Sequence, residues 1–169
     1  MKNSTSRRLV LLAMLAIAMV VVPAVTSLPA GIAGVKDSGC NCHGTETDSS
    51  VTASITGLPE TYNASETYAV IVSFSGGPST DGNMNLGGFN LWASDGTFST
   101  VDDSTQLWGP AEASHTESGN DQRSWTVDWT APESGTNVNF ILHVNSVNGN
   151  EGNGGSSGCL LYTSPSPRD

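Results

Sequence analysis

Apolar and polar residues alternate with a period of two through much of the chain after residue 50. The clearest alternating stretches are Val51–Ile55, Tyr68–Phe74, Phe89–Ala93, Trp125–Trp129 and Val138–Val144, and weaker ones are Thr97–Val101 and Gln106–Trp108. Successive side chains of a strand point to opposite faces, so this pattern predicts half-buried strands between turns rich in Gly, Asn and Asp. No apolar spacing typical of a helix occurs after the N-terminal segment. We therefore predict an all-β fold, a single antiparallel Ig-like β-sandwich of about seven strands.

The N-terminus has the features of a secretory signal. Lys2, Arg7 and Arg8 precede an uninterrupted apolar run, Leu9–Val22, and small residues follow Pro23. We interpret residues 1–27 as a signal peptide that is cleaved, with an uncleaved membrane anchor as the alternative. Both place the rest of the chain outside the cytoplasm, so the protein is expected to be secreted or held at the cell surface.

The C-terminal residues 159–169 resemble a translated sequencing adapter. They read Cys-Leu-Leu-Tyr-Thr-Ser-Pro-Ser-Pro-Arg-Asp, and all eleven match one frame of the mosaic-end adapter of transposase-based libraries. We expect an artefact here and exclude it from the natural fold, so Cys159 is no partner for Cys40 or Cys42. The natural chain is expected to continue past Gly158. Residues 160–163 nevertheless have strand-like composition and can pair into a sheet.

Between these ends, the sequence divides into an arm, residues 28–50, and a sandwich domain, residues 51–158, which is expected to be truncated. Residues 28–158 contain fifteen acidic residues against two basic ones, Lys36 and Arg123, a net charge of −13. Such a surface repels nucleic acid and anionic lipid. No nucleic-acid partner is expected, and membrane contact only through the signal peptide or a missing C-terminal anchor.

The arm carries the residues with the most distinctive chemistry, Cys40-Asn41-Cys42-His43. Two thiols followed by an imidazole are typical of a metal or haem site. With one residue between them, an extended backbone places the two cysteine side chains on one face, about 6.5 Å apart, and His43 on the other. A tight turn brings all three together. Haem c, bound copper or zinc, and a disulfide without a cofactor all stay open.

A further ligand for such a centre has to come from the sandwich. His115, in the polar segment 109–123, is the first choice, with an exposed loop histidine as the alternative reading. His143 is expected on the less apolar face of its strand, at the surface or hydrogen-bonded. Met84, in a Gly/Asn-rich loop, is a possible thioether ligand.

No enzyme motif is present. The sequence lacks a Gly-x-Ser-x-Gly elbow, a phosphate-binding Gly-rich loop with Lys, and His-Glu-x-x-His. We therefore expect no enzyme, and at most an electron carrier.

Several segments resemble a known family. They are Leu28-Pro29-Ala30-Gly31, Gly39–His43, Gly57-Leu58-Pro59, Gly88-Phe89, Ser114-His115-Thr116 and, most specific, Trp125–Pro132 ending in Trp-Thr-Ala-Pro. Together they resemble the Reeler-like secreted modules of prokaryotes known as choice-of-anchor proteins. The resemblance implies an extracellular β-sandwich followed by one of several surface anchors. It also implies an N-terminal Cys-x-x-Cys-His haem c signature, from which this chain departs by one residue.

Two functions follow as expectations. In the first, the protein is a surface module that carries a haem c or metal centre on Cys40, Cys42, His43 and His115, and exchanges electrons with an extracellular redox partner. In the second, it is an adhesion module that binds a surface ligand, and the cysteines form a structural disulfide.

Overall fold

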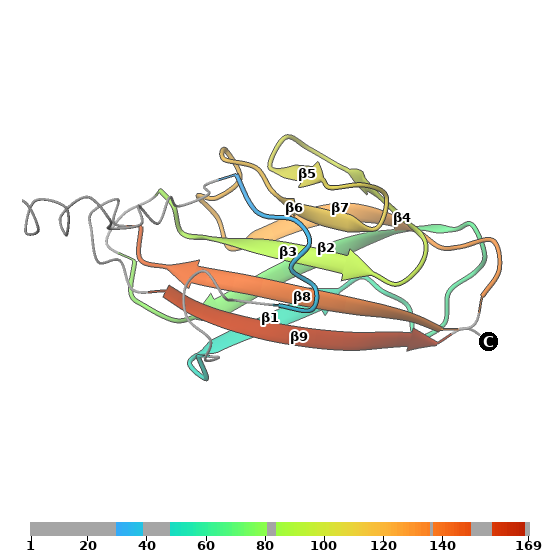
Figure 1. Ribbon diagram of the computed structural model, residues 1–169, viewed down its shortest axis with the longest axis horizontal. Coiled ribbons are helices and arrows are strands. Elements are labelled where there is room, and N and C mark those ends of the chain that lie inside the picture. The colour runs from blue at the N-terminus through green and yellow to red at the C-terminus, as the bar shows by residue number, and fades with distance from the viewer. Residues whose placement is uncertain (1–29, 39–47, 81–83, 136, 150–156, 168–169) are drawn as a thin grey trace, which may run out of the picture.

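The computed structural model describes residues 30–38, 48–80, 84–135, 137–149 and 157–167 (Figure 1). Within these residues it contains nine strands and no helix. The strands are β1 (Val51–Thr56), β2 (Thr67–Gly76), β3 (Gly87–Ala93), β4 (Thr97–Thr100), β5 (Thr105–Leu107), β6 (Glu112–His115), β7 (Ser124–Thr130), β8 (Asn137–Val147) and β9 (Ser157–Pro167). They form two antiparallel sheets, β1-β2-β7-β4 and β5-β6-β3-β8-β9. The prediction of an all-β antiparallel sandwich is confirmed.

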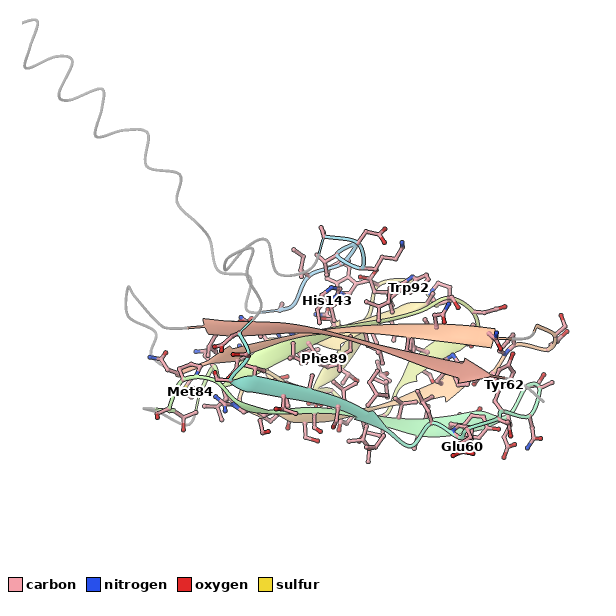
Figure 2. The ribbon with its side chains drawn as sticks, turned by 90° about the horizontal axis from the view of Figure 1, so that it is seen from below. Glu60, Tyr62, Met84, Phe89, Trp92 and His143 are labelled. Carbon is pink, nitrogen blue, oxygen red and sulfur yellow. The ribbon has the colours of Figure 1, made fainter. Side chains whose placement is uncertain are left out.

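The core lies between the inner faces of the two sheets. Every second residue of β7 and β8 is buried there, as the alternation predicts, and Phe89 of β3 points into the same layer (Figure 2). Residues of β8 that alternate with the core positions face outward, and so do Asn90 and Trp92 of β3. This places a polar outer face on the second sheet, in register with its buried inner face.

The segment predicted as a polar loop, residues 109–123, contains a strand. β6 pairs with β3 through Asn90↔Ser114 and with β5 through Thr105↔His115. The prediction that His115 lies in a loop is therefore wrong. β6 has four residues and Ala113 is its only buried apolar residue, so its own sequence carries almost no period-two signal. The strand forms because β3 and β5 offer it hydrogen bonds on both sides.

The predicted signal peptide, residues 1–27, lies outside the described residues, and so do residues 28–29 and 39–47 of the arm. In the part of the chain that the structure describes, no helix is long and apolar enough to cross a membrane.

β9 is made almost entirely of the adapter-like segment. It pairs with β8 over its whole length, from Val147↔Ser157 to Asn137↔Pro167. The sequence-based expectation that this segment can join a sheet agrees with that pairing. Since β8 is an eleven-residue strand whose outer edge needs hydrogen-bond partners, any adjacent segment of strand-forming composition can satisfy it.

We predict that a chain ending at Gly158 still folds, because the buried hydrophobic core of the described residues lies between Val51 and Val144. Removing residues 159–169 opens the edge of β8, so the shortened chain should self-associate at high concentration. Near-ultraviolet circular dichroism and size-exclusion chromatography check this against the full chain. An unfolded product would show that β9 is needed for the fold.

Candidate functional site

Residues 30–38 of the arm lie against the outer face of the second sheet. Figures 1 and 2 show it crossing this sheet on the side opposite the core. Asn90 Nδ2 on β3 donates a hydrogen bond to the Ile32 carbonyl at 2.8 Å. Glu112 Oε1 on β6 accepts one from the Gly34 N–H at 2.7 Å and another from Asn90 Nδ2 at 2.7 Å. Two neighbouring side chains thus hold the arm at consecutive points.

Further contacts extend along the same segment. Gln106 Nε2 on β5 donates to the Ala30 carbonyl. The ammonium of Lys36 lies 5.1 Å from the centroid of the Trp92 ring, which is within the range of a cation–π interaction. The arm is therefore fixed to the sheet from its first described residues to within a few residues of Cys40.

Gly31 allows the arm to approach this closely. Its φ is +77°, and a Cβ added there would lie 2.3 Å from Ser114 Oγ and 2.8 Å from the His115 carbonyl oxygen. A side chain at this position would push the arm away from β6.

His143 lies on the outer face of β8, directly opposite Asn90 (Figure 2). The residue is only 5% exposed, and neither Nδ1 nor Nε2 has a hydrogen-bond partner. The expectation of a surface or hydrogen-bonded histidine is therefore wrong. Burial lowers the pKa of His143, while the Glu112 carboxylate acts more weakly in the opposite direction. The ring is consequently neutral at neutral pH, the form that binds metals.

His115, the first choice from the sequence, occupies a different setting at the end of β6. The Phe89 N–H donates to its Nδ1 at 3.1 Å. Its ring centroid lies 6.2 Å from that of Trp125 and 6.3 Å from that of Phe89, and a Cβ added at Gly88 would lie 2.2 Å from its Cε1. His115 is half-buried, and its Nδ1 is engaged with the backbone of β3.

The other predicted ligands are distributed as follows. Cys40, Cys42 and His43 lie outside the described residues. Met84 is 56% exposed, in the loop before β3. Among the described residues, no three His, Cys, Asp or Glu side chains come together as a metal-binding group.

Sequence reasoning missed Asn90 and Glu112, which hold the arm. A signal was available for Asn90, because it is a polar residue flanked by Phe89 and Leu91 in a strand that is otherwise largely apolar. Glu112 gave none, since β6 was not recognised as a strand.

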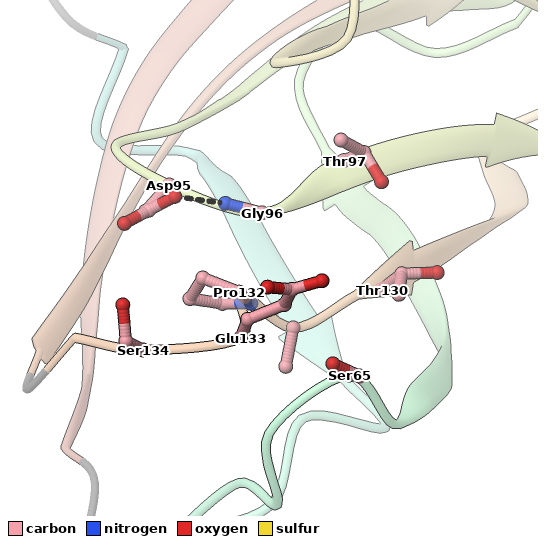
Figure 3. Close-up of a pocket in the computed structure, with 9 residues that line it drawn as sticks. Ser65, Asp95, Gly96, Thr97, Thr130, Pro132, Glu133 and Ser134 are labelled. Atoms are coloured by element: carbon pink, nitrogen blue, oxygen red, sulfur yellow. Dashed lines mark hydrogen bonds between the residues drawn. The ribbon is translucent and has the colours of Figure 1, made fainter.

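An open depression of about 590 Å³ lies at one end of the sandwich, between the β3–β4 and β7–β8 connections (Figure 3). Two carboxylates, Asp95 and Glu133, line it together with hydroxyl groups, and Asp95 Oδ1 accepts from the Gly96 N–H at 2.7 Å. Its described lining includes no thiol and no imidazole. The depression therefore shares nothing with the face that holds the arm.

No protein-family model and no curated protein matches the chain. Similar solved structures are reeler domains. The Reelin-N domain of F-spondin has a TM-score of 0.49 and 20% identity, covering 73% of this chain and 89% of that one. A fragment of the human F-spondin reeler domain has a TM-score of 0.48 and 20% identity, covering 73% and 91%.

Proposed function

We propose that the protein is an extracytoplasmic surface module whose N-terminal arm holds a haem c or transition-metal centre, built on Cys40, Cys42 and His43. The observation that supports this most is the docking of residues 30–38 on the second sheet by the amide of Asn90 and the carboxylate of Glu112. The cation–π contact of Lys36 with Trp92 lies four residues before Cys40. A rigid sheet that holds the adjoining chain limits the positions open to the two thiols, which a cofactor or metal requires.

The donors beneath the arm suit such a centre. The ring nitrogens of His143 and Oδ1 of Asn90 are buried without a hydrogen-bond partner. Imidazole binds haem iron, copper and zinc alike, and the thiolates of Cys40 and Cys42 suit copper or zinc directly or haem through thioether bonds. A bound haem or copper centre would carry single electrons. The net charge of −13 would favour a positively charged redox partner.

The test is haem staining, a pyridine haemochrome spectrum and elemental analysis of the chain produced in a host that attaches haem c. We expect haem iron, copper or zinc in equimolar amount, and its loss in Cys42→Ser. Cys159→Ser is the matched control, because it removes a thiol outside the motif and should keep the centre. A wild-type chain without haem, copper or zinc contradicts the proposal.

A second function, binding of a surface ligand, is favoured by the exposed apolar side chains around β5. Leu107 and Trp108 are 37% and 47% exposed, and Val101 is 52% exposed. An exposed indole next to aliphatic side chains can stack on a sugar ring. If ligand binding is the function and the cysteines only brace the arm, the wild-type chain should show no absorption from a cofactor. Cys42→Ser should then only lower the stability of the fold.

A further inference from the structure

The connection between β1 and β2 contains the triplet Asn63-Ala64-Ser65, which has the form of an N-glycosylation motif. It is the only Asn-x-Ser/Thr triplet between residues 28 and 158. All three residues are exposed. An attached oligosaccharide is bulky and polar, so its acceptor asparagine has to lie at the surface of the folded protein. The position of Asn63 meets this requirement.

The triplet forms a tight turn in which Ser65 has an uncommon backbone conformation. The Glu66 N–H donates to the Asn63 carbonyl at 3.2 Å, the hydrogen bond of a β-turn that begins at Asn63. Ser65, the third residue of this turn, has a φ of +62°, a conformation that favours glycine. The turn uses the backbone of Ser65, whose N–H donates to the Pro132 carbonyl at 3.4 Å. A glycosylation motif needs the hydroxyl, which gives a reason for serine at a position that suits glycine better.

The side-chain amide of Asn63 can take a sugar without giving up its hydrogen bond. Nδ2 carries two hydrogens, and one of them is donated to Glu66 Oε2. A sugar replaces one hydrogen and leaves the other for Glu66. The Tyr68 hydroxyl holds the same turn, because it accepts from the Asn63 N–H at 2.8 Å and donates to Glu66 Oε2 at 3.0 Å. These bonds to Tyr68 do not involve Nδ2, so the turn can keep its geometry in the modified protein.

The turn lies at one end of the sandwich and on the other sheet from the arm. Figure 2 shows Glu60 and Tyr62, which precede the triplet, at the end opposite Met84. β1 and β2 belong to the first sheet, whereas the hydrogen bonds of residues 30–38 go to β3, β5 and β6 of the second. Ser65 also lines the open depression (Figure 3). A glycan on Asn63 therefore starts beside the depression and away from the contacts that hold the arm.

We propose that Asn63 is the acceptor of an N-linked glycan, transferred from an oligosaccharide that is bound to a lipid phosphate. The new bond joins Asn63 Nδ2 to the anomeric carbon of the first sugar, and the bond from that carbon to a phosphate oxygen breaks. The lipid phosphate leaves with the electron pair, Nδ2 releases one proton, and nothing is oxidised or reduced. This inference rests on the extracytoplasmic location in the proposed function and not on the centre of the arm.

The test is secretion of the full chain from a host that transfers N-acetylglucosamine-initiated oligosaccharides to Asn-x-Ser/Thr triplets. Cleavage after glutamate isolates the triplet in one peptide, residues 61–66, because Glu60 and Glu66 flank it. We expect mass spectrometry to find most of this peptide with the added mass of a glycan. Asn63→Gln and Ser65→Gly should both lose that mass. Asn137→Gln is the matched control, since it changes an exposed asparagine outside any such triplet and should keep the glycan.

Ser65→Gly also serves as the folding control. Glycine adopts a φ of +62° without strain, so the thermal midpoint of this variant should stay close to that of the wild type. A secreted wild-type chain whose peptide 61–66 carries no glycan would overturn the inference and leave the proposed function standing. A glycan that persists in Ser65→Gly would also overturn it, because transfer would then not depend on the motif. A glycosylated chain without haem, copper or zinc would support the inference and contradict the proposed function.

Discussion

Trp129→Ala is expected to lower the free energy of unfolding by about 3–5 kcal/mol, the usual loss for a large aromatic side chain removed from a core. Trp129 is fully buried on β7. Its ring meets Phe140 of the opposite sheet at 5.0 Å and Tyr62 at 5.5 Å between centroids, both edge to face, and stacks on Tyr68 at 6.0 Å. Its Nε1 donates to the Asp95 carbonyl at 3.1 Å. The substitution therefore removes a contact between the sheets and the hydrogen bond from the indole to the Asp95 carbonyl.

Urea denaturation followed by far-ultraviolet circular dichroism measures this loss. Trp108→Ala is the matched control, since Trp108 is 47% exposed and its replacement should change stability by about 0.5 kcal/mol or less. Equal losses for the two variants would mean that the sheets do not pack through Trp129.

Glu112→Ala is expected to release the arm and to speed tryptic cleavage after Lys36 about tenfold. The carboxylate accepts hydrogen bonds from the Gly34 N–H and from Asn90 Nδ2, each at 2.7 Å. A hydrogen bond to a charged group contributes about 1.5–3 kcal/mol, and the lower figure corresponds to a tenfold larger population of the released arm. Cleavage rates follow that population when docking is fast.

The chain offers internal controls for this experiment. Lys36 and Arg123 are the only basic residues between 28 and 158, so trypsin reports on two sites. Arg123 donates hydrogen bonds to the carbonyls of Gly76 and Val147 on separate strands, and its cleavage should stay slow. Glu117→Gln, at an exposed acidic residue, should leave both rates unchanged. Faster cleavage at Arg123 as well would indicate general unfolding, and an unchanged rate at Lys36 would show that Glu112 does not hold the arm.

The strands that the sequence predicted well are those with a complete local pattern. β2, β7 and β8 each carry three or more apolar residues at alternate positions, so the inner face of each follows from its own residues. β6 has a single core residue, Ala113, and was predicted as loop. Its pairing depends on β3 and β5, which no window of the sequence around it contains.

The candidate site shows the same division. The thiols and imidazole of Cys40, Cys42 and His43 are evident in the sequence because they are adjacent. From its polar neighbours in the chain, His115 was predicted as the ligand that the sandwich supplies. The sequence did not predict that His143 is buried. The contacts that cover this face join residues far apart, 58 positions between Asn90 and Ile32 and 78 between Glu112 and Gly34.

The sequence alone was enough to predict an antiparallel sandwich, an extracytoplasmic destination and a thiol–imidazole motif, because alternation, a signal segment and neighbouring ligands are local properties of a chain. Only the tertiary structure decided which face of the sheet receives the arm and which histidine loses both water and hydrogen-bond partners beneath it. Those outcomes depend on the strand order β6-β3-β8, which brings Glu112, Asn90 and His143 onto one face. No local pattern of apolar and polar residues specifies that order.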